Sequence, residues 1–232
     1  MSDIATRGAA LQALAVEVES CRACPLGSRR TRSVPGEGSP TAEIVLVGEG
    51  PGATEDVEGR PFVGAAGRLL GGLLALIGLR REDVYILNVV KCHPPANRDP
   101  DPEEISACAP FLRRQMAILD PLVVAPLGRH ALRTFAPDAK ISAAHGSVVA
   151  PAPDAPIPSD ATLLPLYHPA AALHNGALRP TLERDVAALA RALEPARARR
   201  ATARGSGGAA TLSEMQKTVG PRQLRLFEGE NT

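Results

Sequence analysis

Four cysteines are the residues whose type and spacing most directly indicate chemistry in this sequence. Cys21 and Cys24 are separated by two residues, and Cys92 and Cys108 follow later, separated by 15. Four thiolates can bind a zinc ion or an iron–sulfur cluster, and the spacing alone does not decide between these two groups. Disulfides and scattered structural thiols fit less well, because no secretion signal is expected at the start of the sequence and the CxxC pair lies in a polar loop.

A glycine-rich segment, GEGPG at residues 48–52, supplies a second candidate site. Glycine lets the backbone approach a ligand and adopt positive φ angles. A dinucleotide-binding loop would read GxGxxG, whereas here Pro51 intervenes and the third glycine comes one residue early, which argues against a nucleotide-binding oxidoreductase. Downstream, Phe62 lies among small residues. This aromatic ring is suited to stack on a flat ligand, and its spacing fits a core position equally well.

Strands and helices that would position these residues alternate along the chain. Four apolar, partly β-branched runs predict buried strands at residues 43–47, 84–90, 122–127 and 162–166. Amphipathic or well-capped segments predict helices at residues 3–19, 69–79, 102–119 and 181–193. This alternation is typical of a doubly wound, mostly parallel α/β sheet, in which sites gather beyond the carboxyl ends of the strands.

The composition predicts a globular chain without a membrane-spanning segment. Of its 232 residues, 44% are hydrophobic, which is enough to build a core, and no run reaches 18 consecutive apolar residues. The net charge is only +1, so any binding to nucleic acid must depend on local groups. Residues 1–194 are expected to form one domain. Residues 195–232 are expected to be a flexible tail, because their Arg- and Gly-rich start has little to bury.

Four motifs, taken together, resemble the family 4 uracil-DNA glycosylases. They are GEGPGATED, GRPFVGAAGRLL, NVVKCHPPANRDP and YHPAAALHN, in this order and with the cysteines between and around them. The resemblance covers about residues 20 to 193. It implies a uracil-DNA glycosylase-like three-layer α/β/α fold with a mostly parallel four-stranded central sheet. It also implies a 4Fe–4S cluster on the four cysteines and excision of uracil from DNA, leaving an abasic site as the first step of base-excision repair.

The resemblance implies a role for several single residues. The amide of Asn88 would read the O4 and N3–H edge of uracil and disfavour cytosine. Phe62 would stack on the flipped base, and His168 would donate a hydrogen bond to uracil O2 as negative charge develops there. The backbone that surrounds the base would come from Gly48, Gly50, Pro51 and Gly52.

The residue that positions the attacking water is less clearly marked. Better-studied relatives have an aspartate where this chain has Gly50, so Glu49 and Glu55 are the carboxylates left to position the water or to stabilise a cationic sugar. Leu173 could fill the gap left by the flipped nucleotide, or pack inward from the first turn of a helix. Arginines in loops near the motifs would contact phosphates; they are Arg22, Arg29, Arg30, Arg32, Arg98 and Arg179.

The end of the sequence resembles a partner-binding peptide. Gln223, Leu224, Leu226 and Phe227 fit the QLxLF pattern with which bacterial repair proteins bind the sliding clamp. We expect a cytoplasmic monomer that acts on uracil-containing DNA. Two other functions stay open: a relative that traps the abasic sugar covalently, which the absence of an Arg-rich insert disfavours, and a non-catalytic, metal-bound DNA-binding module.

Overall fold

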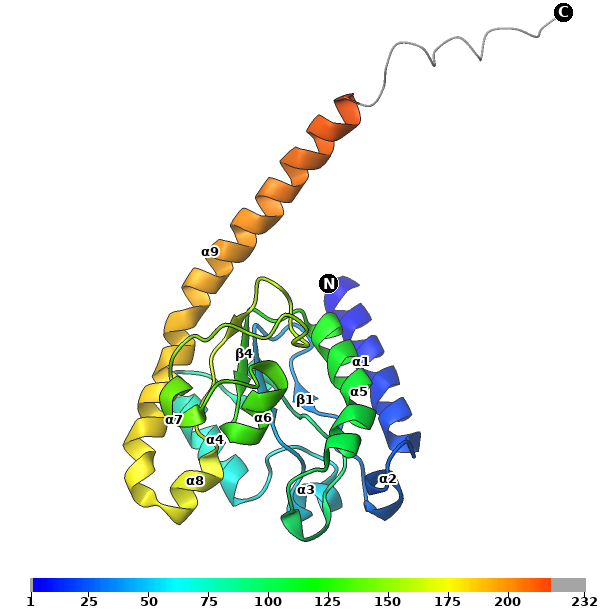
Figure 1. The fold of residues 1–232 in the computed structure, drawn as a ribbon, viewed down its shortest axis with the longest axis vertical. Coiled ribbons are helices and arrows are strands. Elements are labelled where there is room, and N and C mark those ends of the chain that lie inside the picture. The colour runs from blue at the N-terminus through cyan, green and yellow to red at the C-terminus, as the bar shows by residue number, and fades with distance from the viewer. Residues whose placement is uncertain (1, 218–232) are drawn as a thin grey trace, which may run out of the picture.

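The fold is built around one five-stranded sheet. The structure is a computed structural model that describes the backbone of residues 2–217 and the side chains of residues 3–203. The strands lie in the order β1-β3-β2-β4-β5, and only β1 is antiparallel to its neighbour. Figure 1 shows two of them, β1 and β4, among the helices that surround the sheet. Their bounds are Glu37–Gly38 (β1), Ile44–Gly48 (β2), Tyr85–Asn88 (β3), Val123–Pro126 (β4) and Thr162–Leu163 (β5).

Helices precede, connect and follow the strands. The longer ones are α1 (Ser2–Ser20), α4 (Ala65–Leu76), α5 (Pro102–Leu119), α6 (Gly128–Phe135) and α9 (Arg179–Lys217). The short ones are α2 (Leu26–Arg29), α3 (Ala53–Glu58), α7 (Ile141–Ala144), α8 (Pro169–His174) and three 3₁₀ turns, Arg81–Asp83, Pro95–Asn97 and Gly176–Leu178. Within the described part of the chain, no helix is long and apolar enough to cross a membrane.

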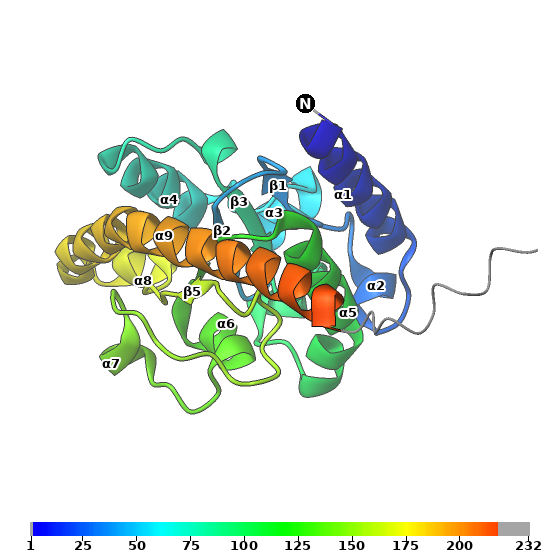
Figure 2. The same cartoon turned by 90° about the horizontal axis from the view of Figure 1, so that it is seen from above.

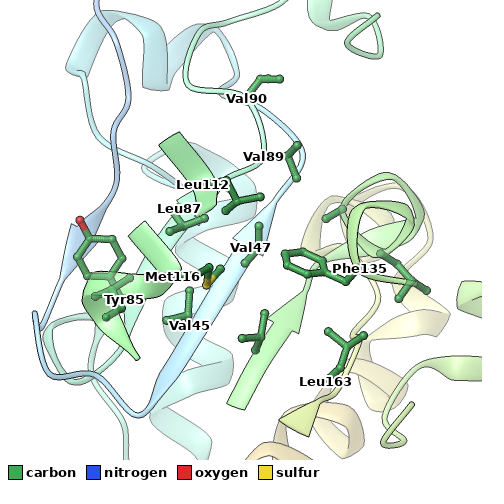
Figure 3. Packing of buried hydrophobic residues seen from close by; sticks show 14 of the residues in the cluster. Val45, Val47, Tyr85, Leu87, Val89, Val90, Leu112, Met116, Phe135 and Leu163 are labelled. Carbon is green, nitrogen blue, oxygen red and sulfur yellow. The ribbon is translucent and has the colours of Figure 1, made fainter. Parts of the chain in front are cut away.

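Helices cover both faces of the sheet (Figure 2). Every residue of β2, β3 and β4 is buried, which explains why these strands are continuous apolar runs and do not alternate with polar residues. One face packs against α1, α5 and α6 through residues that include Val45, Val47, Leu87, Leu112, Met116 and Phe135 (Figure 3). The other face packs against α4, α8 and α9 through residues that include Ile44, Leu46, Ile86, Leu73, Leu74 and Val186. The predicted three-layer α/β/α architecture is confirmed.

The predicted number of strands is wrong by one. The four expected strands are present, although β5 is only two residues long, and β1 adds a fifth at the edge of the sheet. The sequence gives little sign of β1, because Glu37 and Gly38 are poor strand formers. Pairing is possible because Gly38 adopts φ +134°, and a Cβ there would lie 1.9 Å from the carbonyl oxygen of Val84. Only glycine lets the chain approach β3 so closely.

The boundary expected between residues 194 and 195 is not where the packing ends. Helix α9 continues through Pro195, and Ala196 is fully buried. Arg200 forms a two-point ion pair with Asp160. It also donates to the backbone carbonyls of Asp120 and Pro121, which lie just before β4. Residues 195–200 therefore pack on the domain, which the low apolar content of this segment did not indicate. The proposed clamp peptide, Gln223 to Phe227, lies outside the described residues.

Candidate active site

A cavity of about 440 Å³ opens beyond the carboxyl ends of β2 and β3 and beside the start of α8. Eight of the residues expected at the site line it; they are Glu49, Gly50, Pro51, Gly52, Glu55, Phe62, Asn88 and His168. Gly48 does not line the cavity, but it lies against the Asn88 side chain, because an ideal Cβ on Gly48 would be 2.2 Å from Asn88 Oδ1. Leu173 does not line the cavity; it lies on α8 with 51% of its surface exposed, next to His174, which does.

Asn88 ends β3 and presents an unsatisfied acceptor. It pairs in register with Gly48 of β2, so its side chain leaves the sheet at the rim of the cavity. The residue is only 1% exposed, and its Oδ1 has no hydrogen-bond partner. A buried polar atom without a partner costs about 1–3 kcal/mol. A ligand with an N–H group aimed at this oxygen would recover that cost.

Phe62 reaches the cavity from a strained backbone. Its φ angle is +51°, in the left-handed region that residues other than glycine rarely adopt. Arg81 holds this geometry by donating to the carbonyl oxygens of Pro61 (2.7 Å) and Phe62 (2.8 Å), and Arg81 in turn pairs with Glu37 of β1. The edge strand that the sequence did not reveal thus supports the aromatic wall of the site.

His168 is a neutral hydrogen-bond donor at the N-terminus of α8. Burial lowers its pKa to about 4, although the negative charge of Glu55 opposes this shift. Its Nδ1 accepts a hydrogen bond from the backbone N–H of Ala170 at 3.1 Å. The proton of the neutral ring is therefore on Nε2. The ring centroid lies 5.7 Å from that of Phe62, so an aromatic wall and a donor flank the same space.

The two candidate carboxylates have different surroundings. Glu55 Oε1 accepts from the backbone N–H groups of Val63 and Gly64, both at 2.9 Å, so this carboxylate fastens the loop that carries Phe62. Glu49 makes no such bonds. Burial, with the negative charge of Asp99, raises the pKa of Glu49 to about 7.

A histidine that the motifs did not single out lies beside Glu49. His130 Nδ1 is 3.8 Å from Glu49 Oε1, and its Nε2 is 3.3 Å from Asp99 Oδ2. His130 comes from α6, which begins at the carboxyl end of β4, and Asp99 comes from the loop before α5. No local pattern marks His130, because it meets Glu49 only through the order of the strands.

The four cysteines gather at a second, much smaller cavity. Cys21 and Cys24 lie between α1 and α2, Cys92 follows β3, and Cys108 lies in α5; all four are free thiols. Several N–H groups point at the sulfurs. Arg30 donates to Cys92 Sγ at 3.1 Å, and the backbone N–H of residue 91 donates to Cys108 Sγ at 3.3 Å.

The cysteine sulfurs are not gathered as closely as the ligands of a single small ion. Among the described residues, the one group of three or more metal-ligating side chains with ligand atoms all within 4.8 Å is Glu49, Asp99 and His130. No three of the cysteine sulfurs therefore lie that close together. A tetrahedral zinc site with Zn–S bonds of about 2.3 Å would place its sulfurs about 3.8 Å apart.

The arginines expected to contact phosphate are partly used inside the protein. Arg30 is committed to Cys92 and to backbone carbonyls. Arg98 lines the cavity, but its guanidinium forms a two-point pair with Glu104 at 2.7 and 2.8 Å. Arg179 pairs with Glu183 on the surface of α9.

Comparison with known proteins agrees with this geometry. The model of the uracil DNA glycosylase superfamily matches residues 35–191. The chain is 46% identical to the type-4 uracil-DNA glycosylase of Sulfurisphaera tokodaii, over 75% of this chain and 81% of that protein. The chain belongs to the type-4 uracil-DNA glycosylase family. The type-4 uracil-DNA glycosylase of Archaeoglobus fulgidus is 47% identical, over 73% of this chain and 86% of that protein. The one of Thermotoga maritima is 53% identical, over 59% of this chain and 71% of that protein.

A type-5 uracil-DNA glycosylase is more distant. The Thermus thermophilus protein of that type is 35% identical over 53% of the chain. The type-4 assignment is thus supported by both the higher identity and the longer match.

Proposed function

We propose that this chain is a DNA glycosylase that hydrolyses the N-glycosidic bond of uracil in DNA and leaves an abasic site. One observation carries the proposal. The unsatisfied acceptor of Asn88, the ring of Phe62 and the neutral donor of His168 surround one cavity at the end of the sheet. An enzyme that acts on a base must take it out of the helical stack into such a pocket.

Recognition of the base is assigned to Asn88 and Phe62. Uracil carries a hydrogen on N3, which would satisfy the lone Oδ1 of Asn88, while the amide N–H would donate to O4. Cytosine has no hydrogen on N3 and carries an amine at C4, so it would leave this buried oxygen unsatisfied and place two donors face to face. Stacking on Phe62 adds about 1–3 kcal/mol and does not distinguish the bases.

His168 is assigned to the departing base. As the glycosidic bond lengthens, negative charge develops on uracil, and Nε2–H would donate a hydrogen bond to O2. A donor that is fixed before the reaction stabilises such charge without having to reorganise. Because the pKa of His168 is about 4, the ring stays neutral and does not transfer its proton at neutral pH.

Glu49 is assigned to the attacking water. Departure of the base leaves a cationic sugar, which needs a well-placed water more than a strong base. With a pKa of about 7, Glu49 is partly ionised at neutral pH and can accept a proton from that water. Glu55 is committed to two backbone N–H groups, so we assign it to holding the Phe62 loop and to the electrostatics of His168. Leu173, exposed on α8, remains the proposed wedge.

The four thiolates are proposed to hold a 4Fe–4S cluster. The wide spacing of the sulfurs fits a cluster in which each thiolate binds a different iron better than a single zinc ion. Bound there, the cluster would cross-link the N-terminal loop, the end of β3 and α5. Iron and sulfide in a ratio near one, with brown colour lost in Cys92→Ala, would support this proposal. Stoichiometric zinc without visible absorbance would contradict it.

The proposed partners are uracil-containing DNA and, through Gln223, Leu224, Leu226 and Phe227, a sliding clamp. We propose a cytoplasmic monomer, because the DNA that it would act on is there and one chain supplies every residue of the site. A chain that stops after Lys217 should excise uracil from a short oligonucleotide at the full rate but fail to co-elute with the clamp. Co-elution of that shortened chain would contradict the clamp proposal.

The activity is tested with a labelled duplex that carries uracil at one position, beside matched duplexes with thymine or cytosine there. Cleavage by alkali after incubation, confined to the uracil duplex, would support a glycosylase that turns over. A protein–DNA adduct that survives denaturant would instead indicate the covalently trapping relative. If neither appears while the DNA is bound, the chain is a binding module and the proposal fails.

A further inference from the structure

Lys91 lies between the uracil-reading end of β3 and the four cysteines. It is one of the largest fully buried side chains of the described residues, with 1% of its surface exposed. Its Nζ donates a hydrogen bond of 2.6 Å to the backbone carbonyl oxygen of Asn88. No described carboxylate forms an ion pair with it. A buried ammonium without a counter-charge is costly. A group other than a carboxylate must therefore supply the counter-charge.

The thiols are the groups that can supply the missing counter-charge. Lys91 lines the same small cavity as the four cysteines. Its backbone N–H donates to Cys108 Sγ at 3.3 Å, and Cys92 is the next residue along the chain. Four thiolates that hold a cluster or a divalent metal would carry net negative charge, and this charge would face the cavity that Lys91 also lines.

We propose that Lys91 is a positioning residue that couples the cysteine-bound cluster to the uracil-reading amide of Asn88. This inference rests on the function proposed above. Negative charge at the thiolates keeps the ammonium in the interior, and the ammonium fixes the carbonyl of Asn88. The side chain of the same residue faces the cavity, so its direction depends on the peptide that Lys91 holds. The cluster thereby acts on recognition of the base without transferring electrons.

A role limited to filling the core makes a different prediction. Lys91 does not line the main cavity, so it does not touch the base. If it only filled space, Lys91→Met, which has a similar length and no charge, would leave the site unchanged and could raise stability. If it positions Asn88, the variant would bind uracil less tightly while its contacts with DNA phosphates stay the same.

The test uses the full-length, cluster-loaded protein with Lys91→Met, and with Lys140→Met as the matched control, because Lys140 is exposed on the surface. Three quantities are measured: iron per chain, inhibition by free uracil, and affinity for a duplex with an abasic-site analogue. We expect Lys91→Met to keep its iron and its affinity for the abasic duplex, and to raise the inhibition constant of uracil about tenfold or more. Lys140→Met should match the wild type in all three.

An iron-loaded Lys91→Met with wild-type inhibition by uracil overturns the proposal. If Lys91→Met loses its iron, Lys91→Arg decides, since it keeps the positive charge beside the thiolates. Its longer, planar guanidinium cannot keep the 2.6 Å contact in place, so iron should be retained and the inhibition constant should still rise. Unchanged inhibition in Lys91→Arg also overturns it. Failure of the wild type to release uracil would instead refute the proposed function, which separates the two results.

Discussion

An ideal Cβ on Gly48 would lie 2.2 Å from Asn88 Oδ1 and 2.7 Å from two ring atoms of Phe62. Gly48 and Asn88 are paired in register at the ends of β2 and β3, so the amide leaves its strand across the space that a side chain on Gly48 would fill. The first glycine of the GEGPG segment is therefore required by the base-reading amide and the stacking ring. Its own φ angle does not demand glycine.

We expect Gly48→Ala to reduce uracil excision about 100-fold or more, because a shift of about 1 Å in positioned groups can cost that much. Gly71→Ala in α4 is the matched control, since nothing lies within 4 Å of its added Cβ. That control should keep full activity and gain slightly in stability, as alanine favours helix. Single-turnover rates on one uracil duplex compare the two. A full rate for Gly48→Ala would show that Asn88 and Phe62 need no fixed position.

His168 should remain neutral, with its proton on Nε2, at any pH well above 4, because burial disfavours the charged ring. Nitrogen NMR of histidine-labelled protein reports both the charge and the tautomer. Replacement by alanine should lower excision about 10²–10³-fold and leave affinity for an abasic duplex unchanged, since the residue acts on the leaving base. An imidazolium signal from His168 at pH 6 would contradict this account.

Excision should rise with pH across the range from about 6 to 8. The pKa of Glu49 is raised from 4.5 to about 7, so its carboxylate, the form that accepts a proton, becomes the major form only above that value. Because the pKa of Glu49 is higher in the folded chain than in the unfolded one, its bound proton adds to the free energy of unfolding below pH 4.5. This contribution is lost as the pH rises from 4.5 through about 7. Glu49→Gln should lower the rate and remove this rise. A profile that keeps the rise in Glu49→Gln would assign the titration to another group.

Arg81→Met should weaken binding of the uracil duplex, although Arg81 does not line the cavity. Arg81 holds the carbonyls of Pro61 and Phe62, so its loss lets the Phe62 backbone relax from φ +51°. We expect the KM for a uracil duplex to rise about tenfold, in line with the loss of one stacking contact. Arg60→Met is the control, because Arg60 also pairs with Glu37 but does not touch those carbonyls. Equal kinetics for the two variants would show that the strained Phe62 does not depend on Arg81.

Local patterns predicted much of the fold. Helix α5 lies where it was expected, because Asp101 and Glu104 form a capping box around Pro102 and the apolar spacing continues to Leu119. Buried strands β2, β3 and β4 follow from continuous apolar runs. Strand β1 escaped detection because it has two residues and depends on pairing with β3. The extension of α9 escaped detection because Ala196 and Arg200 are held by distant parts of the chain.

The candidate site also contains residues that the motifs indicated and contacts that they did not. The motifs indicated Asn88, Phe62 and His168, and all three line one cavity. They did not indicate that Glu55 is occupied by two backbone N–H groups, nor that His130 and Asp99 lie beside Glu49. Val63 and Gly64 are only eight and nine residues from Glu55, and the loop after α3 brings them back to it. Glu49, Asp99 and His130 come from segments far apart in the sequence, and only the order of the strands brings these three together.

The central claim is that the amide of Asn88 selects uracil in the cavity. The most direct measurement is the single-turnover rate of base release for Asn88→Ala and the wild type, on matched uracil and cytosine duplexes, beside affinity for an abasic duplex. The account predicts that the wild type releases uracil alone, and that Asn88→Ala releases it about 100-fold more slowly with unchanged affinity for the abasic duplex. A folded Asn88→Ala that releases uracil at the wild-type rate would contradict the account.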